Sequence, residues 1–254
     1  MEISRKTWLK YIEALRKVSN KASDEARRFI ETHDLTTEGG LKAFTDFAYA
    51  LVTKYGEGAT AMACEFYDAL AVLSGVSLAP ALPAATATYG ETAKTINGVR
   101  LKSQNTEMLS SSIGRLVKMA GVDTTMQNAI RDGAQWAWIP NGDTCAFCMM
   151  LASRGWQPAS KKALKNGHAE HIHANCDCTY AIRFNDRTFV EGYDPNDYLR
   201  MYRDADGTTS TQKINALRRE FYAENKDRIN AQKRSAYAKR VELNEPSAEE
   251  LNVD

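Results

Sequence analysis

The segment HIHANCDCTYAIRF, residues 171–184, marks the place where the patterning of the chain changes from helical to extended. In its second half every other residue is apolar or a cysteine, and alternate residues of a strand lie on one face. The residues on that face are Cys176, Cys178, Tyr180, Ile182 and Phe184. A second run, WAWIP at 136–140, alternates and ends at a proline, which is typical of a short strand. The two stretches predict a small α+β module.

The cysteines of this region fall into two pairs with the spacing of a zinc site. TCAFC at 144–148 contains a C-x2-C pair, and the second pair is separated by one residue. Zinc in structural sites takes four nitrogen or sulfur ligands, and a reducing compartment favours metal over disulfides for clustered cysteines. The candidate ligands are Cys145, Cys148, His173, Cys176 and Cys178. A turn at 174–175 would allow His173 to replace Cys178 as the fourth ligand, and disulfides or unliganded thiols remain alternatives.

The first third of the chain reads as helices. Its first helix has an apolar stripe at three- and four-residue steps, formed by Trp8, Ile12, Leu15, Val18, Ala22, Ala26 and Phe29 or Ile30. A second helix is expected over 41–55 and a third to about residue 74, separated by Gly56 and Gly58. Within the third, Cys64 is expected to be a buried apolar filler rather than a reactive thiol.

The middle of the chain is expected to contain a connection followed by two more helices. Residues 74–90 have the composition of a linker or an ordered loop. Helices are expected at 107–121 and 123–137, the second capped by the carboxylate of Asp123. No apolar run has the length and hydropathy of a membrane span, and the N-terminus lacks the pattern of a secretory signal.

Charge is balanced overall but unevenly distributed. The formal net charge is +1, whereas residues 213–240 hold nine basic and three acidic residues (9 − 3 = +6), and residues 241–254 hold five acidic and no basic residues. We expect a charged helix from about Thr209 and a disordered acidic tail. The candidate DNA contacts are Arg218, Arg219, Lys226, Arg228, Lys233 and Arg234. An acidic capsid face, or a solvated helix with internal ion pairs, would explain the same charges.

Together these patterns predict an α+β, mostly helical protein in three parts. The parts are a helical region at 1–120, a zinc-stapled α+β module at 121–205, and a charged helical extension with an acidic tail at 206–254.

Catalytic motifs are weak in this sequence, so we expect no enzyme. HAE at 168–170 has the H-x-E form of zinc deaminases, but here the C-x2-C pair precedes it, and four cysteines would close the metal's coordination sphere. The alternative is a zinc-dependent nucleic-acid enzyme or toxin that uses His171, His173 and Glu170. Its candidate phosphate contacts are Arg154, Lys161, Lys162 and Lys165. A free-standing DNA-binding zinc module is a third hypothesis.

Residues 120–185 as a whole resemble the C-terminal half of phage minor head proteins of the Mu F type, in the version common in phages of Gram-positive hosts. The positions that carry this resemblance are Asp143, Cys145, Cys148, Leu151, Arg154, Gly155, His173, Asn175, Cys176 and Cys178. Two features depart from the pattern: Asp177 stands where many relatives carry arginine, and Ile172 with His171 replaces a proline pair.

This resemblance implies a non-enzymatic virion protein, present in few copies at the portal vertex or capsid interior and in the host cytoplasm during assembly. It implies roles in head assembly, DNA packaging or DNA ejection. The expected partners are the portal protein, the major capsid protein or packaged double-stranded DNA, with no small-molecule substrate. The expected cofactor is a structural zinc ion.

Overall fold

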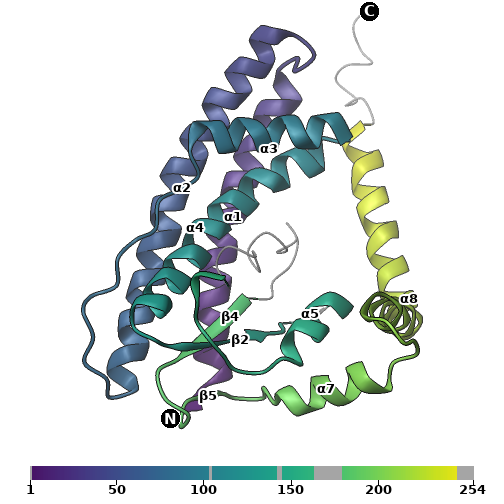
Figure 1. The fold of residues 1–254 in the computed structure, drawn as a ribbon. Helices are drawn as coiled ribbons and strands as arrows, with labels where there is room; N and C mark the ends of the chain where they lie inside the picture. The colour runs from purple at the N-terminus through teal and green to yellow at the C-terminus, as the bar shows by residue number, and fades with distance from the viewer. Residues whose placement is uncertain (1, 103–104, 142–144, 163–178, 245–254) are drawn as a thin grey trace, which may run out of the picture.

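The main body is an upright helical bundle with a small sheet at one end. The structure is a computed structural model, which describes residues 2–102, 105–141, 145–162 and 179–244. Three long helices pack together in the bundle: α1 (Arg5–Thr32), α2 (Glu38–Leu73) and α4 (Thr106–Arg131). Helix α3 (Tyr89–Lys102) crosses the upper part of the bundle, below the tip formed by α1 and α2 and away from the sheet (Figure 1). The prediction of an α+β, mostly helical fold is confirmed.

Helix α1 forms where the apolar stripe predicts it. The Ser4 side chain caps its first turn, with Oγ accepting from the Thr7 amide at 3.2 Å, so one of the unpaired amides at the helix start is satisfied. The side chains buried against the bundle are Trp8, Ile12, Leu15, Ser19, Ala22 and Ala26. The opposite face of α1 is therefore left to solvent.

Helix α2 runs through the predicted break at residues 56–58, so the expectation of two separate helices is wrong. A Cβ on Gly56 would lie 2.6 Å from Cγ2 of Thr86, which is too close for any side chain. Gly58 has nothing within 4 Å of a Cβ position, so its backbone simply continues the helix. The glycine at 56 provides space for a neighbouring segment and does not end the helix.

Helix α4 is likewise continuous, and the expected cap at Asp123 is wrong. The cap is Asn105, whose Oδ1 accepts from the Glu107 amide at 2.8 Å. A Cβ on Gly121 would lie 3.1 Å from the carbonyl oxygen of Ala59, so this glycine permits close packing of α4 on α2. The predicted boundary between residues 120 and 121 falls inside this helix.

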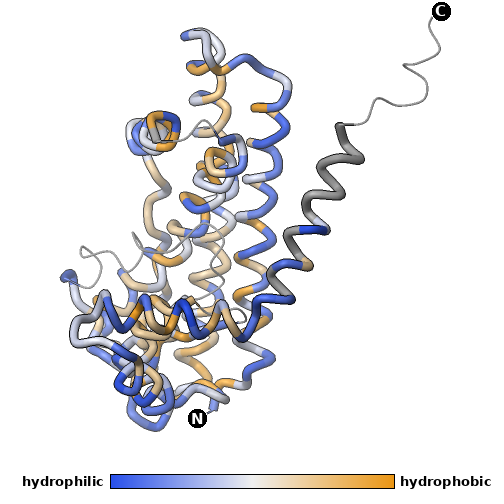
Figure 2. Tube along the Cα trace, turned by 90° about the vertical axis from the view of Figure 1, so that its right-hand side faces the viewer, coloured by the Kyte–Doolittle hydropathy of each residue, from blue (hydrophilic) through white to orange (hydrophobic). Residues whose placement is uncertain are grey.

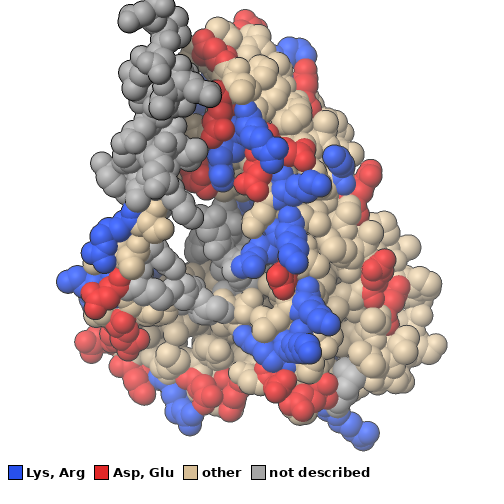
Figure 3. Space-filling view, turned by 180° about the vertical axis from the view of Figure 1, so that it is seen from behind, with Lys and Arg blue, Asp and Glu red and all other residues tan. Residues whose placement is uncertain are grey.

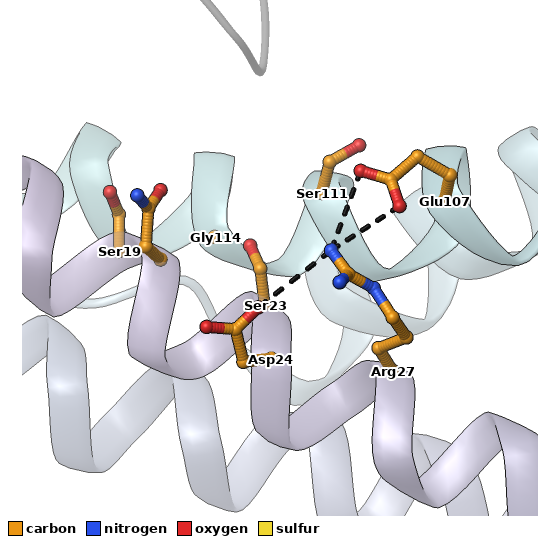
Figure 4. Close-up of a pocket in the computed structure, with 8 residues that line it drawn as sticks. Ser19, Ser23, Asp24, Arg27, Glu107, Ser111 and Gly114 are labelled. Carbon is orange, nitrogen blue, oxygen red and sulfur yellow. Dashed lines mark hydrogen bonds and ion pairs between the residues drawn. The ribbon is translucent and has the colours of Figure 1, made fainter. Parts of the chain in front are cut away.

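Helices α1 and α4 are in close contact at Gly114. A Cβ there would lie 2.6 Å from the carbonyl oxygen of Ser19 and still closer to Oγ of Ser23. A polar cavity of about 240 Å³ opens beside this contact, as Figure 4 shows. At its end Arg27 Nη2 lies 3.2 Å from Oε2 of Glu107 and pairs with Asp24 on its own helix. Carboxylates thus already neutralise the guanidinium, so the cavity is a polar seam in the bundle.

Residues between α2 and α3 form an ordered loop, one of the two alternatives that the sequence left open. Asn128 of α4 accepts from the Leu82 amide at 2.9 Å and donates to its carbonyl at 2.8 Å. Thr124 accepts from the Ala84 amide, and Arg131 donates to the carbonyls of residues 79 and 80. The loop is therefore fastened along α4.

The sheet contains the two predicted strands. β2 (Gln135–Ile139) lies in the middle, antiparallel to β3 (Gln157–Pro158) on one side and to β4 (Thr179–Arg183) on the other. Side chains of these strands join α1 and α4 in one buried cluster that includes Trp8, Met126, Trp136, Trp138, Tyr180 and Ile182. The sheet thus shares its core with the bundle.

A two-residue strand near the start of the chain pairs with a distant one. β1 (Glu2–Ile3) is parallel to β5 (Phe189–Val190), and the Glu191 amide donates to the Ile3 carbonyl at 3.0 Å. The Arg5 amide in turn donates to Oε2 of Glu191 at 2.7 Å. The beginning of α1 is therefore held by the segment that follows β4.

Three further helices lie beside the sheet: α5 (Ala146–Ala152), α7 (Pro195–Asp204) and α8 (Ser210–Asn244). The expected charged helix is confirmed as α8, which packs on α5 and α7 and then extends away from the body (Figures 1 and 2). Lys213 Nζ donates to the Ala205 carbonyl at 2.8 Å and to those of Tyr202 and Arg203, which end α7. This cation satisfies acceptors left unpaired at a helix C-terminus.

No helix among the described residues has both the length and the apolar character that crossing a bilayer requires. The acidic tail, which was expected to be disordered, lies outside the described residues from 245 onward.

Candidate metal centre

The first predicted cysteine pair lies at the start of α5. Cys145 is the N-cap residue and is half-buried, and Cys148 is 2% exposed within the cluster that contains Ile139 and Tyr180. Residues three apart at a helix start lie on the same side of it. Two sulfurs placed in this way can bind one tetrahedral ion, so this pair fits half of a zinc site.

Strand register places the second cysteine segment at the same end of the β2–β4 strand pair as the first. Ile139, the last residue of β2, pairs with Thr179, the first residue of β4. Cys178 is joined directly to Thr179, and Cys145 follows Ile139 by six residues, a reach of about 20 Å at most. Both cysteine-bearing segments therefore leave from one end of the β2–β4 pair.

The remaining predicted ligands, His173, Cys176 and Cys178, lie outside the described residues. So do His168, Glu170 and His171 of the alternative enzyme hypothesis, together with Lys165. In the part of the chain that is described, no three His, Cys, Asp or Glu side chains are grouped so that they could hold a metal. The zinc site and its ligand set stay a prediction.

The turn after α5 explains the Leu-x-x-Arg-Gly part of the motif. Leu151 is buried, Arg154 is exposed, and Gly155 has a φ of +65°, a backbone conformation that favours glycine. A Cβ on Gly155 would also lie 3.3 Å from the Cβ of Pro195, the first residue of α7. Tyr193 donates to the Ala152 carbonyl at 2.8 Å, which fastens the end of α5. The motif positions that are described thus set the direction of the chain around the cysteine pair.

The fifth cysteine, Cys64, lies far from this edge in the sequence and is half-buried in α2. Burial raises the pKa of its thiol. A raised pKa keeps the thiol protonated, and therefore weakly nucleophilic, at neutral pH. Cys64 is therefore less buried than the expected filler, while the direction of its pKa shift argues against a reactive thiol.

The predicted DNA-contact residues all lie in α8. Arg218, Arg219, Lys226 and Arg234 are exposed, whereas the side chains of Arg228 and Lys233 lie outside the described part of the helix. Arg154, Lys161 and Lys162, the phosphate contacts of the enzyme hypothesis, are all exposed within the described residues 145–162. Sequence reasoning missed Lys213 as an anchor, although a lysine one turn into α8, after a helix end, was the available signal.

The fold is that of an α+β protein, in which a helical bundle shares its core with a small antiparallel sheet. A cysteine pair beside this sheet is the candidate metal site. A family model described as VG15 protein matches residues 2–205, which is 204 of the 254 residues, so the chain belongs to the VG15 family. This is a family of viral proteins, and membership indicates a phage-encoded protein. No curated protein and no solved structure matches the chain.

Proposed function

We propose that the protein is a structural, non-enzymatic minor head protein of the Mu F type, associated with the portal vertex of a phage capsid. Its action would be in head assembly, DNA packaging or DNA ejection, with the portal or major capsid protein as partner. In the infected cell it would be cytoplasmic before it enters the virion.

One observation supports this proposal above the others. The β2–β4 register starts the two halves of the cysteine motif from one end of this strand pair, as a single metal site would require. Membership of a viral family over residues 2–205 is consistent with this role.

In this proposal a bound zinc ion would stabilise the fold and would not take part in a reaction. Cys145 and Cys148 would provide two ligands, and the segment 173–178 would provide the others. A filled tetrahedral sphere leaves no position for a reacting water. Metal binding would then contribute folding free energy, on the order of 10 kcal/mol for small zinc modules.

The head role is tested by mass spectrometry of purified phage particles. We expect peptides of this chain in DNA-filled heads, at far fewer copies than the major capsid protein. A deletion phage should yield particles with packaging or infection defects that the wild-type gene restores. Absence of the chain from purified particles would contradict the proposal.

The zinc site is tested on the isolated full-length chain. We expect about one zinc per chain by elemental mass spectrometry, and loss of that zinc together with a lower Tm in Cys145→Ser and Cys148→Ser. Cys64→Ser is the matched control and should retain the metal. His168→Ala and Glu170→Ala should leave infectivity intact, whereas an enzyme would lose activity with these changes and keep its fold.

The exposed basic residues of α8 would contact packaged DNA in this setting. An acidic face of the portal or shell is the competing partner for the same helix.

A further inference from the structure

The N-terminal half of α1 carries a second concentration of positive charge. Residues 5–21 hold six basic residues and one acidic residue, so 6 − 1 = +5 in a chain whose net charge is +1. The rest of the helix, residues 22–32, holds two basic and three acidic residues (2 − 3 = −1). The excess is therefore confined to the first five turns.

The four lysines among these six basic residues form one line on the solvent face of the helix. At 100° per residue, Lys6, Lys10, Lys17 and Lys21 fall within an arc of about 60°. All four are exposed, because the other side of α1 is buried in the bundle. Figure 3, which views the molecule from behind, shows blue side chains in an upright run over this helix. We call these four residues the α1 lysine row.

The upper end of the row continues onto α2. Lys21 Nζ lies 5.9 Å and Lys54 Nζ 4.8 Å from the centre of the same Tyr55 ring. The ring attracts each ammonium, but the two like charges repel each other. Basic side chains of both helices thus lie at this ring, so the positive surface extends from α1 to α2.

The one acidic residue of the segment does not cancel the row. Glu13 pairs with Lys17, with Nζ 3.5 Å from Oε1, and both side chains are more than half exposed (Lys17 74%, Glu13 52%). An ion pair this exposed is weak and easily exchanged for another anion. All four lysines are thus able to contact a partner.

We propose that the α1 lysine row binds the phosphate backbone of double-stranded DNA without sequence preference. Lys6 and Lys21 are 15 residues apart, about 22 Å along the helix axis. Over that length one DNA strand presents about six phosphates at 3.4 Å per charge. The inference rests on the proposed head role for its biological setting alone, since DNA binding is measured on the purified chain.

The composition of the row favours DNA over an acidic protein partner. Protein interfaces are depleted in lysine and depend on buried aromatic or arginine anchors. The row consists of lysines with exposed ammonium groups, and its largest exposed apolar neighbour on α1 is Leu9, at 37%. Flexible point charges are suited to a backbone of regularly spaced phosphates.

The test compares DNA binding by full-length variants in which basic side chains are replaced by neutral ones. The probe is a fluorescein-labelled duplex of 30 base pairs, titrated by anisotropy between 50 and 200 mM salt. The row variant replaces Lys6, Lys10, Lys17 and Lys21 with glutamine, and we expect its slope of log K against log salt to be less steep by about 3.6, at 0.9 per contact. Affinity at 50 mM salt should fall at least ten-fold. A double variant, Lys10→Gln with Lys21→Gln, should lose about half of that slope if the fourfold variant folds poorly.

A matched control removes the same number of charges from other elements. It replaces the exposed residues Lys42, Lys94, Arg187 and Arg200 with glutamine, and it should bind DNA within about three-fold of wild type. Another variant neutralises Arg218, Arg219, Lys226 and Arg234 on α8, which separates the two basic helices. Circular dichroism and Tm establish that each variant is folded.

Four results would overturn the proposal. They are equal weakening by the row and control variants, loss of binding in the α8 variant alone, no salt-dependent DNA binding by wild type, and preference of wild type for polyglutamate over duplex. The last would identify an acidic protein as the partner. Particle composition tests the head role separately, so failure of either idea is recognised without the other.

Discussion

Replacing Asp123 with asparagine should stabilise the protein at neutral pH and have no effect in acid. Asp123 lies in the C-terminal half of α4 and is half-buried. Burial, and secondarily the charge of Glu91, raise the pKa of its carboxyl from 3.8 to about 6. The ionised carboxylate is therefore less stable in the folded state than in the unfolded chain.

The magnitude follows from the difference between the two pKa values. A shift of about 2 corresponds to roughly 3 kcal/mol, at 1.36 kcal/mol per pH unit. Because folding raises the pKa of this carboxyl, the folded state has its full stability below pH 3.8, and this part of the stability is lost as pH rises through 6. Asparagine stays neutral, so the variant should gain up to roughly 3 kcal/mol at pH 7.5, or about 6–12 °C in Tm for a chain of this size.

The assay is urea and thermal unfolding of both proteins at pH 4, 5, 6, 7 and 7.5. The two stability curves should lie within about 0.5 kcal/mol of each other at pH 4 and separate mainly between pH 4 and 6. Asp46→Asn is the control of opposite sign, because hydrogen bonds from Lys42 and Tyr89 lower the pKa of that exposed carboxyl. A gain in Asp123→Asn that is the same at every pH, or no gain at pH 7.5, would refute the argument.

Four further substitutions test how the body is held together. Gly114→Ala should force α1 and α4 apart by about 0.8 Å (3.4 − 2.6, from Cβ to the Ser19 carbonyl oxygen) and lower the free energy of unfolding by about 1–3 kcal/mol. Gly58→Ala is the control, because a Cβ there meets open space, and it should stabilise the protein by about 0.5–1 kcal/mol. Equal effects of the two changes on thermal unfolding would disprove the close contact. Asn128→Ala removes the two part-buried hydrogen bonds to the Leu82 amide and carbonyl, so stability should fall by about 1–3 kcal/mol, and amide exchange in residues 80–84 should accelerate. Unchanged exchange would show that other contacts hold the loop. Lys213→Met should release α8 from α7 and increase proteolysis of α8 while the Tm of the body stays the same, and undiminished protection would count against the anchor.

Elements that local patterning determines were predictable from the sequence. The stripe on α1 reflects one face packed on a core, which a period of 3.6 reveals directly. Sequence alternation located β2 and β4 as well, although side chains on both faces of these strands are buried in the structure. The charged helix α8 followed from composition in the same way.

Errors arose where a residue's role depends on a distant segment. Gly56 was expected to break α2, but its purpose is set by Thr86, which lies 30 residues further along. Asp123 had the chemistry of a cap, yet tertiary burial of α4 overrode that local preference. Helix α3 was not anticipated, because its glycines and lysines give no clear apolar stripe.

The candidate site was predictable only in part for the same reason. Spacing identified the pair Cys145 and Cys148, and α5 places them on one turn as expected. The shared edge of β2 and β4 depends on strand register, which the sequence does not specify by itself.

The parallel pairing of β1 with β5 has a consequence for synthesis on the ribosome. Ile3 and its partner Val190 are 187 residues apart (190 − 3), which takes about 10–40 s at 5–20 residues per second. Throughout that interval the first turn of α1 lacks its final neighbour and stays accessible to chaperones or assembly partners. Nascent chains should therefore protect this turn from proteases only after residue 191 has emerged.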